Sequence, residues 1–204
     1  MSETFSTIVV GFGRAADGQR LDVRTSRHFA YASHAQVLDA HAAFDWRGVV
    51  DPDPDALGTA RRDWGIEEVS AELGAIAAAV DPEVAVITAP AAARPAIVEA
   101  LPSLKAVVVE KPLGIELEDG EALLRVCEAR GILVQVNYWR RASPLYRELA
   151  DGRLGELVGH CQTAFATYGN GLFNNAGHAV DLVRMVLGEV AAVRALGPAV
   201  SLRN

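Results

Sequence analysis

The sequence changes abruptly from apolar to charged at Lys111, a residue whose amine could take part in acid–base chemistry. Residues 107–114, VVVEKPLG, are typical of a buried strand that ends in Glu110, Lys111 and Pro112. Open α/β sheets bind their ligands at this end of their strands. A positive charge nearby would disfavour the ammonium form of Lys111 and make it a proton donor. An ordinary exposed lysine after a strand is the alternative interpretation.

A second residue suited to proton transfer is His178. Residues 169–182, GNGLFNNAGHAVDL, predict a loop that enters a helix, with Asp181 one turn after His178. We expect His178 near the N-terminus of this helix, where the helix dipole lowers the pKa of an imidazole and keeps the ring neutral. A neutral histidine near pH 7 is a suitable general acid or base. A capping or packing role is the alternative.

Two further features predict a dinucleotide site. Residues 11–16, GFGRAA, follow the first predicted strand and match the G-x-G-x-x-A fingerprint, in which Gly11 makes the turn and Gly13 lets a pyrophosphate approach. Asp51 ends the second predicted strand, where a carboxylate would bind the ribose hydroxyls of NAD. A carboxylate repels a 2′-phosphate, so NAD is favoured, while Arg61 or Arg62 on the next helix leaves NADP open. Capping of that helix is the alternative for this segment, and Asp53 is well suited to it.

The spacing between these features indicates an insertion. Asp51 follows Gly11 by about twice the usual ~20 residues, and residues 17–32 are too polar and aperiodic to continue a helix. Helical pattern resumes near His34. The insertion carries Arg20, Arg24 and Arg27, which could clamp a phosphate or a substrate acid, although a solvated loop is the simpler account.

Strand and helix patterns alternate over the first two thirds of the chain. Apolar segments rich in Val or Ile predict strands at residues 7–11, 44–51, 84–88, 106–109 and 132–136, and three- and four-residue spacing predicts helices at 54–64, 70–80, 91–101 and 116–130. This alternation predicts an α/β domain with a doubly wound parallel sheet over residues 1–137.

The pattern changes from residue 138 onward. A helix start at Ser143-Pro144, a turn at 151–155, strands at 157–167 and 190–196 and a helix within 171–187 are expected. Two strands and one or two helices do not make an independent domain. Residues 138–204 therefore pack onto the first domain or a partner chain, or the sequence is a truncated form of a longer protein.

Composition excludes several classes of protein. The net charge of −7 and pI near 5.2 argue against nucleic-acid or acidic-membrane partners, which would need a basic patch. No apolar run approaches the ~20 residues of a membrane span, and the N-terminus lacks the features of a secretory signal, so we expect a cytoplasmic protein. Cys127 and Cys161 lack metal-ligand spacing, which indicates reduced structural thiols and no metal site.

The ordered set of motifs resembles the Gfo/Idh/MocA oxidoreductases. The resemblance rests on the glycine loop, Asp51, a strand ending in Thr88-Ala-Pro90, Glu110-Lys-Pro112, and the segments 137–141 (NYWRR), 152–155 (GRLG) and 177–182 (GHAVDL). It implies NAD(P)-dependent hydride transfer on a small-molecule substrate, mostly a sugar, cyclitol or related polyol. It also implies a Rossmann domain over 1–137, then the start of an α+β open-sheet domain over 138–204 that shapes the substrate pocket and can form a homo-oligomer.

Carried over residue by residue, the resemblance implies that Lys111 lies beside the nicotinamide and the substrate oxygen, and that His178 exchanges the proton. It assigns cofactor binding to Gly11, Phe12, Gly13, Arg14, Asp51, Thr88, Pro90, Glu110 and Lys111.

Three departures from the family pattern leave alternatives open. Asn174 replaces the usual Asp four residues before His178, and an amide can orient a hydroxyl but cannot carry a proton away. Arg94 stands where the family's T-P-x-x-x-H segment has a histidine. The sequence also ends before most of the open sheet. A truncated, catalytically impaired dinucleotide-binding or regulatory protein is therefore the rival hypothesis, and reduction of an imine or another conjugated system stays open.

Overall fold

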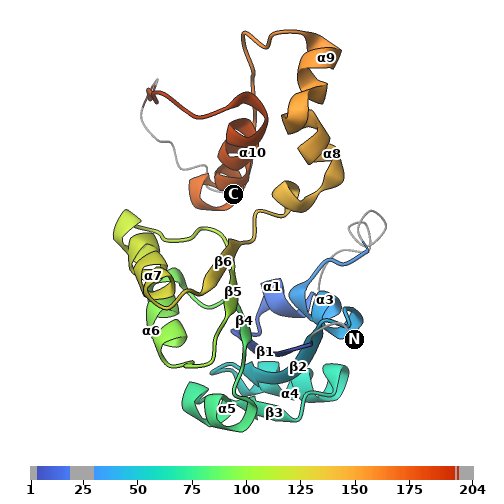
Figure 1. The fold of residues 1–204 in the computed structure, drawn as a ribbon, viewed down its shortest axis with the longest axis vertical. Coiled ribbons are helices and arrows are strands. Elements are labelled where there is room, and N and C mark those ends of the chain that lie inside the picture. The colour runs from blue at the N-terminus through green and yellow to red at the C-terminus, as the bar shows by residue number, and fades with distance from the viewer. Residues whose placement is uncertain (1–3, 19–29, 196, 198–204) are drawn as a thin grey trace. The chain divides into compact units, whose positions relative to one another are not determined.

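The computed structural model describes residues 4–18, 30–195 and 197. The chain divides into two compact units, Met1–Asn137 and Tyr138–Asn204, and each is described by itself (Figure 1). The arginines expected in the insertion, Arg20, Arg24 and Arg27, lie outside the described residues.

The first unit contains a parallel sheet, as the alternating pattern predicts, with six strands where the pattern predicted five. Its strand order is β3-β2-β1-β4-β5-β6, so the direction of winding reverses between β1 and β4. The strands are β1 (Phe5–Val10), β2 (Phe44–Val50), β3 (Glu68–Ser70), β4 (Val84–Ile87), β5 (Ala106–Val109) and β6 (Leu133–Val136). This is a Rossmann-type doubly wound sheet, whose ligands bind where the strand order reverses.

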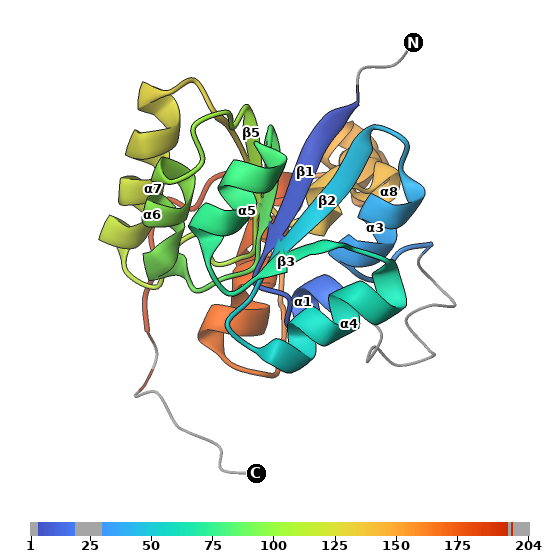
Figure 2. The ribbon, with the colours of Figure 1, turned by 90° about the horizontal axis from the view of Figure 1, so that it is seen from below.

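Among the described residues of this unit, seven helical segments connect the strands and cover both faces of the sheet. They are α1 (Arg14–Asp17), α3 (His34–Ala40), α4 (Pro54–Trp64), α5 (Leu73–Val80), η1 (Ala91–Ala93), α6 (Arg94–Glu99) and α7 (Leu117–Ala129). Figure 2 shows α5, α6 and α7 on one side of the strands and α1, α3 and α4 on the other.

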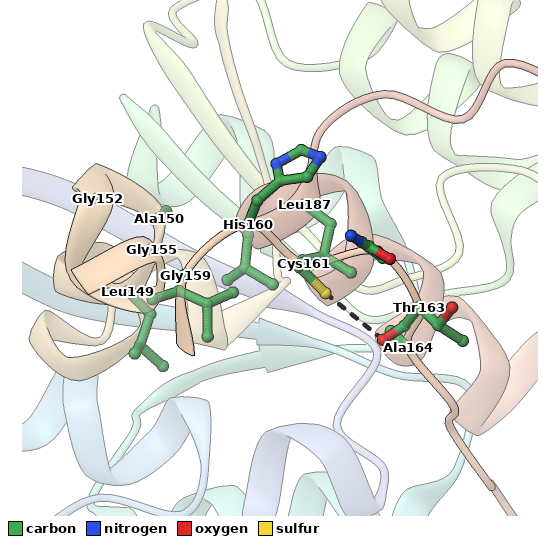
Figure 3. A pocket seen from close by; sticks show the side chains of 13 residues that line it. Leu149, Ala150, Gly152, Gly155, Gly159, His160, Cys161, Thr163, Ala164 and Leu187 are labelled. Carbon is green, nitrogen blue, oxygen red and sulfur yellow. Dashed lines mark hydrogen bonds between the residues drawn. The ribbon is translucent and has the colours of Figure 1, made fainter. Parts of the chain in front are cut away.

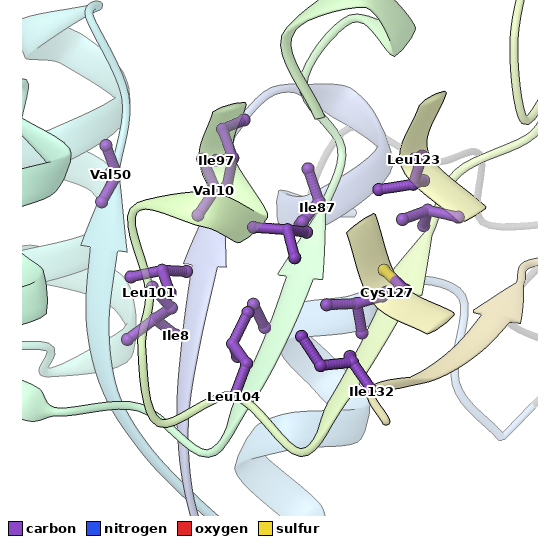
Figure 4. Packing of buried hydrophobic residues seen from close by; sticks show 14 of the residues in the cluster. Ile8, Val10, Val50, Ile87, Ile97, Leu101, Leu104, Leu123, Cys127 and Ile132 are labelled. Atoms are coloured by element: carbon purple, nitrogen blue, oxygen red, sulfur yellow. The ribbon is translucent and has the colours of Figure 1, made fainter. Parts of the chain in front are cut away.

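Each face of the sheet buries its own apolar cluster. Side chains alternate between faces along a strand, so Ile8 and Val10 of β1 pack beneath α5, α6 and α7 while Val9 packs beneath the opposite helices. Figure 4 shows the first cluster, in which Leu123 and Cys127 of α7 meet the sheet. Because both faces are covered, the strands fix the loops at their carboxyl ends on a rigid base.

All the regular secondary structure in the described residues of the second unit is helical. Its elements are η2 (Trp139–Ala142), α8 (Pro144–Glu148), η3 (Leu149–Arg153), α9 (Leu154–Val158), η4 (Leu172–Ala176) and α10 (Gly177–Leu187). The predicted strands at 157–167 and 190–196 are wrong for the described residues. Leu157 and Val158 complete α9, and residues 159–171 and 188–195 are irregular. A strand forms by hydrogen bonding to a neighbouring strand, and the described part of this unit contains no segment that pairs in this way.

None of the helices in the described part of the chain has the length and apolar character that crossing a membrane requires.

Candidate functional site

The loop after β1 is shaped by Gly11, which has a φ of +88°. Its amide donates to the Val50 carbonyl at 2.8 Å, and its carbonyl accepts from the Thr88 hydroxyl at 2.7 Å. A Cβ at this position would lie 2.8 Å from Thr88 Oγ1 and 2.9 Å from the Ala89 amide. Only glycine fits, because both the positive φ and the close approach exclude a side chain.

Gly13 has a different environment from Gly11. A Cβ built on Gly13 would meet no atom within 4 Å, so this part of the loop faces open space. Gly13 is also the residue from which α1 begins, with Arg14 in the first helical position. A second glycine facing open space is what a dinucleotide fingerprint needs for the backbone to approach a pyrophosphate.

Phe12 anchors the loop between these glycines. Its side chain is buried, and its ring lies 5.9 Å from that of Trp46 between centroids. Trp46 in turn lies 5.8 Å from Trp64, whose indole donates to Asp17 at 3.2 Å. The side chain of Phe12 therefore packs in the core.

Asp51 joins the end of β2 to the glycine loop. Its Oδ2 accepts a short hydrogen bond from the Phe12 amide, and its Oδ1 accepts from the Asp53 amide at 2.8 Å. Each carboxylate oxygen keeps a lone pair for a further donor, such as a ribose hydroxyl. The capping role that was the alternative for this segment belongs to Asp53, whose Oδ1 accepts from the Asp55 amide at 2.9 Å at the start of α4.

Two adjoining cavities lie at this end of the sheet. The larger, about 370 Å³, is lined by predicted cofactor residues from three loops, namely Gly11, Gly13, Arg14, Asp51, Thr88 and Pro90. The smaller, about 150 Å³, shares Gly13, Arg14 and Asp51 and adds Asp17, Asp53 and Asp55. No sequence pattern marks Asp17 and Asp55 for this site, because their place beside Gly13 depends on the way β2 and α4 meet α1.

Glu110, another predicted cofactor residue, is bound by two side chains of the protein. Its Oε1 accepts from His34 Nε2 at 2.8 Å and from Asn137 Nδ2 at 2.7 Å. Burial would raise the pKa of Glu110, but these hydrogen bonds and the charge of Lys111 outweigh it, and the net effect lowers the pKa. An ionised Glu110 thus ties α3 to the ends of β5 and β6, beside the half-buried Lys111.

Arg94 is the charged residue whose role the sequence did not reveal. It is only 3% exposed, and its guanidinium donates to the carbonyls of Ala89, Pro112 and Leu113. Burial lowers the pKa of Arg94, and the nearby Glu110 charge acts in the opposite direction. Arg94 therefore links the loop after β4 to the loop that carries Lys111.

His178 and Asn174 belong to the second unit. The helical backbone begins at Leu172 and continues through Ala176 into α10, so His178 lies in the second turn and not at a helix N-terminus as expected. The rings of His178 and Tyr138 meet edge to face, with 5.7 Å between their centroids. Asn174 is exposed on η4. Lys111 lies in the other unit.

Asp181 is one of only two buried residues in the described part of the second unit, the other being Ala176. Its carboxylate accepts from Arg141 Nε at 2.7 Å. Burial raises the pKa of Tyr138, and the charge of Asp181 adds to the effect. The Asp181 of the GHAVD motif thus serves as a buried anchor for Arg141.

The second unit also contains an open cavity of about 510 Å³ between the irregular segment after α9 and the end of α10 (Figure 3). His160 and Cys161 are among its lining residues, and the thiol of Cys161 donates to the Thr163 carbonyl at 3.6 Å. His178 and Asn174 are not among them. Among the described residues, no three His, Cys, Asp or Glu side chains gather in a way that could hold a metal ion.

Three solved structures show the same fold. An oxidoreductase from Agrobacterium radiobacter, in complex with NAD⁺, L-tartaric acid and magnesium, has a TM-score of 0.70 and 19% identity over 95% of this chain and 59% of its own. A 3-ketoreductase from Actinomadura kijaniata, in complex with TDP-benzene and NADP, has a TM-score of 0.68 and 19% identity over 91% of this chain and 57% of its own. Apo scyllo-inositol dehydrogenase from Lactobacillus casei has a TM-score of 0.65 and 19% identity over 90% of this chain and 55% of its own.

The chain therefore spans little more than half the length of these three proteins. No curated protein has a sequence that matches it.

A family model settles the classification of the first unit. The model described as the oxidoreductase family with an NAD-binding Rossmann fold matches residues 5–138, which include the glycine loop, Asp51, Arg94 and Lys111. The chain thus belongs to the Gfo/Idh/MocA oxidoreductase family.

Proposed function

We propose that this chain binds NAD at the carboxyl ends of β1, β2 and β4 and serves in hydride transfer between the nicotinamide and a carbonyl or secondary alcohol. The observation that carries the proposal is the junction at Asp51. One carboxylate joins the glycine loop to the end of β2 and lines both cavities there. Sugars, cyclitols and related polyols are the substrate class, since the fold is shared with scyllo-inositol dehydrogenase.

Gly11, Phe12 and Glu110 support the site through the protein's own contacts, and the other predicted residues meet the cofactor or the substrate in this proposal. The open face of Gly13 and the amide of Arg14 receive the pyrophosphate, Asp51 binds the ribose of the adenosine, and Thr88 and Pro90 line the cleft toward the nicotinamide. The cofactor supplies the hydride. Lys111 polarises the substrate oxygen, His178 exchanges its proton, and Asn174 orients a hydroxyl.

Carboxylates around the adenosine end favour NAD over NADP. Asp17, Asp51, Asp53 and Asp55 all line the smaller cavity, where a 2′-phosphate would meet four negative charges against the single cation of Arg14. The sequence alone offered only Asp51 for this preference. The additional carboxylates strengthen it, because like charges brought together without compensation are unfavourable.

Turnover with a panel of keto-sugars and ketocyclitols tests the proposed reaction. We expect NADH oxidation with at least one of them, and loss of that oxidation in Lys111→Ala with NADH affinity retained. Lys105→Ala is the matched control, because Lys105 is the other lysine of the chain and pairs with Glu83 at the opposite end of β5. Loss of NADH affinity together with turnover in Lys111→Ala would contradict the role given to Lys111.

The rival function is a dinucleotide-binding or regulatory protein that does not turn over substrate. Asn174 favours it, since an amide stands where the family has a proton-carrying carboxylate. NADH binding without oxidation across the whole panel is the result expected from this rival.

A further inference from the structure

We propose that Arg94 is a positioning residue for Lys111, a role that rests on the proposed function of Lys111 and goes beyond it. Arg94 begins α6, directly after η1, and is almost completely buried. It does not line either cavity of the cofactor site, so it acts through the backbone that it binds.

One guanidinium group holds two loops of the site together. Nε donates to the Ala89 carbonyl at 3.1 Å, in the loop after β4. Nη1 donates to the Pro112 carbonyl at 2.8 Å and to the Leu113 carbonyl at 3.2 Å, in the loop after β5. The two residues that follow Lys111 are therefore fixed relative to the loop that carries Thr88 and Pro90.

The residue that precedes Lys111 is fixed from another direction. Glu110 accepts hydrogen bonds from His34 of α3 and from Asn137 after β6. Lys111 thus lies between two anchored neighbours, so its backbone has little freedom to move. A reacting group gains from such restriction, because displacement of about 1 Å is enough to slow a reaction strongly.

Arginine is better suited than other residues to hold two loops together. Its planar guanidinium presents donors in a fixed fork, which can bind carbonyls on two loops at once. A neutral histidine, the residue that the family pattern has here, offers a single N–H donor. Burial of a cation is unfavourable unless it is hydrogen bonded, and the three carbonyls and the charge of Glu110 compensate for it.

The experiment uses the unusual lysine content of the chain. Lys105 and Lys111 are its only lysines, so protein labelled with ¹³C-lysine gives two sets of side-chain Cε signals, which Lys105→Arg assigns. The signals are recorded for wild type and Arg94→Lys, without cofactor and during an NAD⁺ titration. Arg94→Lys keeps the charge but loses the fork. It also adds a third set of lysine signals, which a further Lys111→Arg substitution in the same protein distinguishes from that of Lys111.

Arg130→Lys is the matched control, and the lysine signals that it adds are assigned in the same way. Arg130 also donates to three backbone carbonyls, those of Val98, Leu101 and Pro102, with distances between 2.6 and 2.8 Å. These carbonyls precede β5, whereas Lys111 follows it. Thermal denaturation of both variants shows whether their losses of stability are comparable.

We expect the Lys111 signals of the cofactor-free protein to move and sharpen in Arg94→Lys while those of Lys105 stay in place, and both sets to be unchanged in Arg130→Lys. The NAD⁺-induced shift of Lys111 should fall by at least half in Arg94→Lys only. Identical Lys111 signals in the two cofactor-free variants would overturn the inference. Absence of NAD⁺ binding by wild type would instead refute the proposed function, and the cofactor-free comparison would still decide the role of Arg94.

Discussion

Gly11 and Gly13 lie two residues apart in one loop but meet different physical requirements. Gly11 needs its positive φ and has no room for a Cβ against Thr88 and Ala89, whereas Gly13 has ordinary φ and faces open space. The first glycine thus serves the fold, and the second leaves open space, which the proposed function assigns to a pyrophosphate.

Alanine substitutions should separate these two requirements. Gly11→Ala should lower the free energy of unfolding by roughly 1–3 kcal/mol, through backbone strain and the contact with Thr88. Gly13→Ala should leave stability nearly unchanged and weaken NAD⁺ binding, because its methyl group would occupy the space needed by the pyrophosphate. Denaturant unfolding and NAD⁺ titration of both variants measure this. Equal effects of the two substitutions on both quantities would contradict the distinction.

At the residue scale, the sequence predicted the glycine loop and Asp51 but gave no indication of the role of Arg94. A glycine fingerprint and a carboxylate after the second strand have fixed spacings that a sequence can display. The hydrogen bonds of Arg94 go to carbonyl oxygens, which every residue possesses, so no sequence pattern signals them.

At the scale of elements, α3 is tied to the sheet through Glu110. The carboxylate accepts from His34 on α3 and from Asn137 after β6, and these bonds together with the Lys111 charge lower its pKa despite burial. A carboxyl group whose pKa is lowered on folding stabilises the protein above its unfolded pKa, and this contribution is lost as the pH falls through the folded pKa.

Glu110→Gln should therefore destabilise the fold at pH 7 by about 1–3 kcal/mol, the usual range for hydrogen bonds to a charged group. The difference from wild type should persist above about pH 5 and shrink as the pH falls below about 4.3, the ordinary pKa of Glu. Chemical denaturation from pH 3 to pH 8 provides the test. Glu121→Gln on α7 is the control, because the exposed pair of Glu121 with Arg125 contributes little. A difference that stays constant down to pH 3 would exclude an ionised Glu110 as its source.

Local signals explain which elements the sequence could predict. The bounds of α4 follow from Asp53 as N-cap, Pro54 in the first turn and Gly65 with a φ of +68° after the last residue. β3 was missed because Glu68-Val-Ser70 contains a single apolar residue, and its pairing with β2 is what makes it a strand. The strand predicted at 157–167 failed for the complementary reason, since suitable side chains do not form a strand without a neighbour to pair with.

At the scale of the whole molecule, the two units differ in how many of their residues are buried. The first has a sheet covered on both faces, whereas the second buries only Ala176 and Asp181 among its described residues. Phe165 and Val193 are 90% and 89% exposed there. The first unit is thus the part of the chain on which a cofactor site can be tested directly.

The central claim, that Asp51 and the glycine loop bind NAD, is tested most directly by calorimetric titration of wild type and Asp51→Ala with NAD⁺ and NADP⁺. We predict that wild type binds NAD⁺ at least about tenfold more tightly than NADP⁺, a difference of about 1.4 kcal/mol. Asp51→Ala should lose most of this preference, because the carboxylate supplies both the ribose acceptor and part of the repulsion. Tighter binding of NADP⁺ by wild type, or no binding of either cofactor, would contradict the claim.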